Sequence, residues 1–140
     1  MSDAFAPAEI AERVETVGVA KATSDTLTTL VLATLAGAFI SLGALLYVVV
    51  VTDSTLGTGP TRLLGGASFS LGLVLVVVAG AELFTGNNLV AMAWAGRRIS
   101  TPQLLRNWLL VYVGNVLGCL GSAGLDLGCI DGLSFVIAFA

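Results

Sequence analysis

Charged residues are scarce in this 140-residue chain: they make up 11% of it, while 56% of the residues are hydrophobic. A soluble domain usually carries about 25% charged residues, because water must wet its surface. The scarcity excludes an ordinary soluble domain and indicates that lipid surrounds most of the chain. The charges sum to −3 and form no basic cluster, which argues against nucleic acid as a partner.

Histidine is absent from the sequence, which removes the commonest general base and the usual metal ligand. The two cysteines, Cys119 and Cys129, match no metal-ligand spacing, and we interpret them as apolar packing residues. No nucleophile, base or metal cluster is visible, so the sequence predicts neither an enzyme nor a bound cofactor or metal. Residues 1–26 are polar and acidic and do not resemble a secretory signal.

Two long runs without charge predict two membrane spans. One extends from Leu27 to Thr52 and the other from Asn107 to Leu125, with Thr101 and Pro102 opening the second helix. A helix needs about 20 mostly apolar residues to cross the hydrocarbon core, and both runs meet that length.

A third apolar run, from Leu63 to Gly96, is too long for one straight span. A continuous helix of that length would reach roughly 50 Å, against a hydrocarbon core of about 30 Å. Glu82 is its only charge, and a glycine and two asparagines follow at Gly86, Asn87 and Asn88. Glycine ends helices and asparagine starts them. We therefore predict helices over 62–82 and 88–97, joined by a short non-helical loop.

The chain before the first span carries its own pattern. Ile10, Val14 and Val17 share one face over residues 8–20, which predicts an amphipathic helix that docks on protein. The sequence thus divides into an N-terminal amphipathic segment over 1–26, a three-span unit over 27–125 and a tail over 126–140. The fold class is an all-α membrane protein with three transmembrane helices, the second of them broken.

Arginines predict the orientation. The connection between the second and third spans carries Arg97, Arg98 and Arg106, while the preceding connection carries Arg62 opposed by Asp53. Positive loops stay inside, so we expect the N-terminus in the cytoplasm.

Small residues four apart on all three spans favour close helix contact, because helices in lipid gain from van der Waals approach. The pairs are Ala33 with Gly37, Ser68 with Gly72, and Gly114 with Gly118, followed by Gly121. Glycine is also simply common in membrane helices, and the pattern leaves open whether the partner is this chain or another.

Thr85 is the candidate site residue in the predicted break. A half-helix starting nearby would present free N–H groups, and the threonine hydroxyl can donate to an oxyanion. The alternative is an ordinary surface loop. For Glu82 we favour a structural carboxylate, bonded to loop N–H groups or an arginine, over an acid catalyst. Phe69, Leu73, Leu83 and Phe84 either pack or face lipid, or form constrictions that exclude water.

Separate motifs then resemble one family, the formate/nitrite transporters, over about residues 7–118. Pro7 to Ala22 is similar to the surface helix of that family, Leu35 to Gly43 to its first span, and Asn107 to Gly118 to its third. A run at the predicted break resembles the signature motif of the family: Gly80-Ala81-Glu82-Leu83-Phe84-Thr85-Gly86-Asn87.

The resemblance implies half of an aquaporin-like fold of two inverted repeats, assembled as a homopentamer with a pore in each protomer. It implies transport of formate, nitrite or hydrosulfide, sometimes with a proton. The pore threonine of the family corresponds to Thr85, next to Gly86 and Asn87. The apolar constrictions of the family correspond here to Phe69, Leu73 and Leu83, and Phe84 is next to Leu83.

Two departures qualify the resemblance. The family's second half supplies another broken helix and a central histidine, and neither is present here. The likeness also fades past Gly118, so we expect a truncated or split member. The function predicted is transport of small monovalent anions across the cytoplasmic membrane, as a homo-oligomer or with a complementary second half. The alternative is a non-transporting membrane fragment or interaction protein that packs through its small-residue faces.

Overall fold

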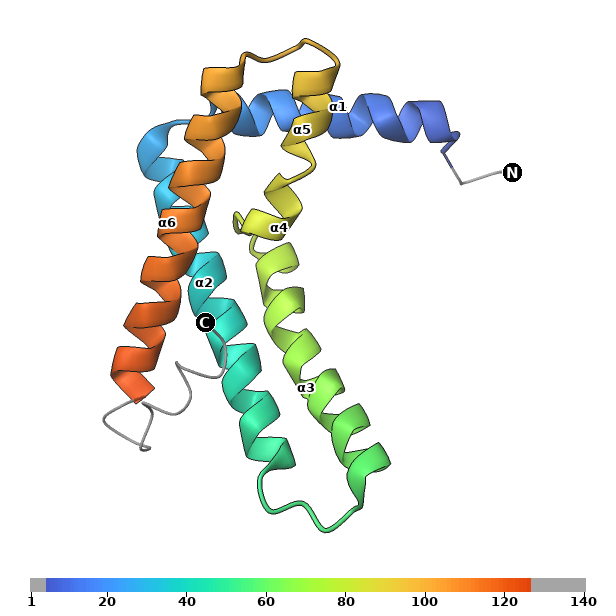
Figure 1. The fold of residues 1–140 in the computed structure, drawn as a ribbon, viewed down its shortest axis with the longest axis vertical. Coiled ribbons are helices and arrows are strands. Elements are labelled where there is room, and N and C mark those ends of the chain that lie inside the picture. Colours follow the sequence, from blue (N-terminus) through green and yellow to red (C-terminus); the bar gives the residue numbers. More distant parts are fainter. Residues whose placement is uncertain (1–4, 127–140) are drawn as a thin grey trace.

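Helices alone form the regular structure of residues 5–126, the part of the chain that this computed structural model describes (Figure 1). Nearly all of the expected tail, with Cys129, lies outside this range. The helices are α1 (Pro7–Thr23), α2 (Thr26–Val51), α3 (Thr58–Val78), α4 (Phe84–Asn87), α5 (Val90–Ala95) and α6 (Thr101–Asp126).

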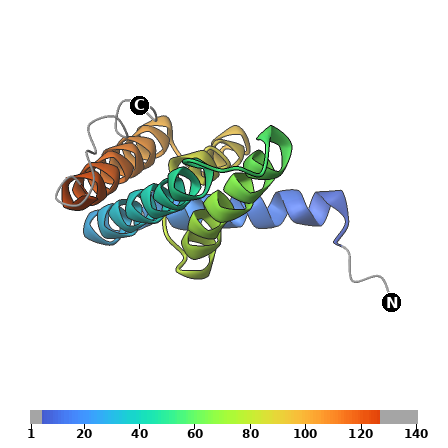
Figure 2. The same cartoon turned by 90° about the horizontal axis from the view of Figure 1, so that it is seen from below.

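Three of these helices are long and apolar enough to cross a membrane: α2, α3 and α6. This confirms the three predicted spans. Helix α2 lies in the middle, with α6 on one side and α3 on the other (Figure 2). At 1.5 Å per residue, a helix as long as α2 extends about 39 Å, enough for the hydrocarbon core and part of both interfaces.

Glycines bring α2 and α6 into backbone contact. A Cβ atom added to Gly118 would overlap the carbonyl oxygen of Thr34, and one added to Gly37 would overlap the backbone of Asn115. On the other side of α2, a Cβ added to Gly72 of α3 would lie 2.6 Å from the carbonyl oxygen of Phe39. The glycines of the predicted pairs therefore contact other helices of this chain, although no atom of residues 5–126 is found within 4 Å of a Cβ added to Gly121.

The second span is broken, but not where the sequence predicted. Helix α3 ends at Val78, four residues before the expected end at Glu82, and residues 84–87, predicted to lie in a loop, form the turn of α4. Gly80, with a φ of +62°, ends the helix in a conformation that glycine adopts without strain. The correction therefore moves the break from Gly86 to Gly80.

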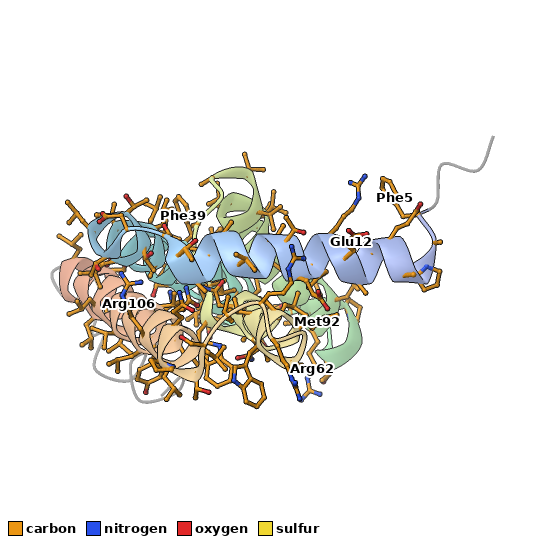
Figure 3. All side chains as sticks on the ribbon, turned by 90° about the horizontal axis from the view of Figure 1, so that it is seen from above. Phe5, Glu12, Phe39, Arg62, Met92 and Arg106 are labelled. Atoms are coloured by element: carbon orange, nitrogen blue, oxygen red, sulfur yellow. The ribbon has the colours of Figure 1, made fainter. Side chains whose placement is uncertain are left out.

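Helix α1 lies across the end of the bundle (Figure 1), and Figure 3 shows Phe5 at its outer end. Gly18 is buried there, and a Cβ at this position would lie 3.0 Å from the Cβ of Ala93 in α5. Arg106 of α6 donates to the carbonyl of Ser24, just after α1. Helix α1 thus contacts α5 and α6, whereas Ile10 and Val17 of the predicted apolar face are exposed.

Candidate functional site at the helix break

The link between α3 and α4 leaves helical geometry beside the first third of α2. Gly80 and Ala81 still donate to carbonyls of α3, but the N–H of Glu82 donates to the carbonyl of Leu32 in α2, at 3.2 Å. Leu83 is extended and starts α4. Because Leu32 lies about 9 Å along α2 from its first residue, the break lies within the span and not at its end.

Asn115 of α6 bonds to both sides of the break. Its Oδ1 accepts from the N–H of Phe84 at 2.9 Å, and its Nδ2 donates to the carbonyl of Glu82 at 2.9 Å. The same Nδ2 donates to the carbonyl of Ala33 in α2 at 2.8 Å. One side chain therefore joins α2, α6 and the broken span.

The ring of Phe84 packs against two aromatic residues of α6. Its centroid lies 6.4 Å from that of Trp108 and 5.7 Å from that of Tyr112, both edge to face. The indole N–H of Trp108 also donates to the carbonyl of Asn87 at 3.0 Å. Helix α6 thus fixes the first and last residues of α4.

A second polar network joins α1 to the break. Lys21 donates to the carboxylate of Glu82 at 2.9 Å and to the side-chain oxygen of Asn87 at 2.8 Å. Asn87 donates to Asn107 of α6, which donates to the carbonyl of Lys21. Asn87 and Asn107 are buried. Glu82 therefore pairs with a lysine of α1, and not with the arginine or loop N–H groups that the sequence suggested.

The structure separates the predicted pathway residues by their surroundings. Thr85 and Gly86 are exposed, and within residues 5–126 no acceptor is found for their backbone N–H groups. Leu83 is half-buried against the cluster of Ala36, Val76 and Ala81. The side chain of Asn87 uses its polar atoms inside the protein.

The remaining predicted pathway residues lie further from the break. Phe69, half-buried, and Leu73, 47% exposed, belong to α3 itself. Leu83, Phe84, Thr85 and Gly86 thus lie together at the break because they are consecutive in the chain. Phe69 and Leu73 lie apart from them, earlier in the span.

An open hollow of about 260 Å³ lies between α1 and the segment after the break. Its polar lining includes Arg13 and Lys21, and Gly86 and Leu89 contribute from the other side. The Lys21 side chain is 28% exposed but paired with Glu82, so Arg13 supplies the positive charge of this hollow next to the exposed part of α4.

Lys21, Asn107 and Asn115 are site residues to which sequence reasoning gave no role. A usable signal was present for the two asparagines, because polar side chains inside a membrane span are costly and usually serve structure or function. Lys21 gave no such signal, since it precedes the first span and only the docking of α1 brings it to Glu82.

These features define the class: a multi-pass helical membrane protein with a broken span. The sequence profile of the formate/nitrite transporters matches residues 8–133. The chain is 46% identical to the formate channel FocA of Escherichia coli strain K12 over 119 residues, covering 84% of this chain and 42% of that protein. It is also 46% identical to the uncharacterized transporter YrhG of Bacillus subtilis strain 168 over 116 residues, 81% of this chain and 44% of that protein.

The chain belongs to the formate/nitrite transporter family. The match reaches residue 133, which corrects the expectation that the likeness ends near Gly118. The chain spans less than half the length of these curated relatives.

Proposed function

We propose that this chain forms part of a transport path for small monovalent anions, such as formate or nitrite, across the cytoplasmic membrane. Membership of the family and the similarity to a formate channel support transport over catalysis. The observation that carries the proposal is the break inside a span, which leaves Thr85 and Gly86 exposed.

The proposed role of Thr85 follows from the energy of an anion in lipid. A bare anion in a dry medium of low dielectric costs tens of kcal/mol by Born solvation. The hydroxyl of Thr85 and the N–H groups of Thr85 and Gly86 would offset part of this cost, and carrying the neutral acid would avoid most of it. Leu83 and Phe84 would exclude water beside them.

The hollow beneath α1 would be the approach to this path. Arg13 and Lys21 line it, and positive charge in a concave site raises the local concentration of anions. The arginines between the second and third spans support a cytoplasmic location for this end, and with it for the N-terminus.

A complete path would need more than these three spans. Among the described helices only α2 covers α3 closely, and large apolar side chains on α3 such as Leu63, Val77 and Val78 are strongly exposed. We propose that lipid and either further copies in a homopentamer or a complementary second half cover them, as half of an aquaporin-like fold. The alternative of an interaction protein loses support, because the small-residue pairs are used inside the chain.

Uptake of labelled formate and nitrite into liposomes tests the role of Thr85. Thr85→Val keeps the shape of the side chain and removes the hydroxyl, and we expect uptake to fall by a factor of about ten or more, since a hydrogen bond to a charged group contributes roughly 1.5–3 kcal/mol. Thr85→Ser keeps the hydroxyl and should retain most of the uptake. Samples with and without a complementary half are compared. Unchanged, selective uptake by Thr85→Val would reject this site.

A further inference from the structure

The break removes several hydrogen bonds that a continuous helix would have, and two of them involve the N–H of Phe84 and the carbonyl of Glu82. In an α-helix the N–H of residue 84 would donate to the carbonyl of residue 80, and the carbonyl of residue 82 would accept from residue 86. Here the N–H of Phe84 and the carbonyl of Glu82 both bond to the side chain of Asn115. Asn115 thus replaces these two of the missing helical bonds.

The amide of Asn115 fits this position in a way that other side chains cannot. Its two N–H protons donate to the carbonyls of Ala33 and Glu82, and its oxygen accepts from Phe84. Aspartate could accept but not donate when ionised, leucine could do neither, and glutamine is longer by a methylene. The three bonds are partly buried, where a lower dielectric strengthens them.

Asn115 also lies on the face of α6 that holds the ring of Phe84. Trp108, Tyr112 and Asn115 are spaced by four and three residues, and residues at these spacings are neighbours on a helix surface. The ring and the N–H of Phe84 are therefore fixed by the same rigid helix. Thr85 is the next residue along the chain, so its position depends on that of Phe84.

We propose that Asn115 is a positioning residue of the transport path. It fixes the backbone from Glu82 to Phe84 against α2 and α6, and in this way it sets where the hydroxyl of Thr85 stands. It acts through that backbone and not by contact with the anion. Its effect on transport rests on the proposed function, whereas its effect on the backbone does not.

Amide hydrogen exchange of the full chain in nanodiscs, followed by NMR, tests the effect on the backbone. In Asn115→Leu the amide of Phe84 should exchange roughly tenfold faster, because it loses its acceptor. The amide of Val111, buried in the same helix, should stay as slow as before and shows that α6 is folded. Unchanged exchange at Phe84 would overturn the proposal.

Asn107→Leu is the matched control. It removes the same amide from the same helix, but that amide bonds to Asn87 and to the backbone of Lys21. Exchange at Phe84 should therefore stay within about twofold of the unmodified chain. An equal loss of protection at Phe84 in both variants would overturn a specific role for Asn115.

Asn115→Asp gives a second test in case the leucine variant does not assemble. It is the same size and keeps an oxygen that accepts from the N–H of Phe84, while its ionised form loses both donations. Protection at Phe84 should then be retained, while the uptake of formate falls because the carbonyl of Glu82 loses its donor. Loss of protection at Phe84 in the aspartate variant would count against the assigned bond.

Uptake of formate and acetate into liposomes that contain the same variants tests the consequence for transport. A displaced Thr85 should lower the ratio of formate uptake to acetate uptake in Asn115→Leu. An unchanged ratio in a folded variant that has lost protection at Phe84 would overturn the positioning role. If the unmodified chain carries no formate with or without a complementary half, the proposed function fails, and exchange at Phe84 still decides the bond.

Discussion

The contact between α2 and α6 differs in kind from the contact that holds the broken span. Between α2 and α6, glycines such as Gly37 and Gly118 let the backbones touch. Around the break, contact depends on polar side chains, chiefly Asn115, Asn87 and the Lys21–Glu82 ion pair. One contact depends on shape and the other on hydrogen bonds.

The difference follows from the solvent. Apolar burial does not drive helices together in lipid, so two regular helices gain most from close approach of their backbones. A broken helix has unpaired N–H and carbonyl groups, which are costly at membrane depth unless they find partners or line a cavity. Polar side chains are therefore concentrated where the backbone is irregular, and small residues where it is regular.

Substitution of Gly118 should have the largest effect, because it acts on the contact that depends on shape. In Gly118→Ala the new Cβ meets the carbonyl oxygen of Thr34, a backbone atom that cannot rotate away. We expect the free energy of unfolding to fall by about 3 kcal/mol, the upper end of ordinary overpacking. Reversible denaturation in detergent, followed by circular dichroism, measures this change.

Gly121→Ala is the matched control on the same helix. In the part of the chain that the structure describes, nothing lies within 4 Å of a Cβ added at Gly121, and alanine favours helix over glycine by up to about 1 kcal/mol. Its stability should be equal or slightly higher. Equal destabilisation by both substitutions would show that shape does not decide this contact.

The ion pair at the break should give an intermediate effect. The Lys21 and Glu82 side chains are 28% and 14% exposed, between a surface pair and a buried one. Lys21→Met should therefore cost about 2 kcal/mol, between the ranges for surface and buried pairs. A double-mutant cycle with Glu82→Gln measures the coupling between the two side chains.

The pair of Arg98 with Glu15 provides the comparison for that cycle. The distance between its charged nitrogen and oxygen is longer, at 3.7 Å, and the side chains of Arg98 and Glu15 are more exposed, at 44% and 30%. The coupling energy of this pair should therefore be below about 1 kcal/mol. Equal coupling for the two pairs would contradict the view that the break depends on its partly buried polar contacts.

The smallest effect is expected at the N-terminus of α2, where Asp25 caps the helix. The N–H of Thr28, and then that of Leu27, bonds to the carboxylate and holds the pKa of Asp25 below its ordinary value of 3.8. Because the pKa is lowered by folding, the stabilisation is present above pH 3.8 and is lost as the pH falls through the lowered pKa. Asp25→Ala should remove it at every pH.

Hydrogen exchange of Leu27 and Thr28 at neutral and acidic pH measures this cap. Both amides should exchange faster in Asp25→Ala, while Asp25→Asn keeps an accepting oxygen and should lose the pH dependence only. Amides deep in α6 should not respond, since that helix makes no use of the cap.

Much of the fold could be predicted from the sequence. Hydropathy gave the three spans, the spacing of small residues gave the close contacts, and the length of the run from Leu63 to Gly96 required a break. The predicted position of that break was wrong. In the sequence, Gly86, Asn87 and Asn88 resemble a signal that ends a helix. In the structure the Asn87 side chain forms hydrogen bonds with Lys21 and Asn107, and Gly80 is the residue in the left-handed conformation.

Length and hydropathy are local properties, and they were enough to show which segments cross lipid and that the second could not do so as one straight helix. Where that helix breaks, and what holds it there, depends on how the helices pack. The bonds of Asn115 and Lys21 join residues more than thirty positions apart, so they exist only once α1, α2 and α6 are in place.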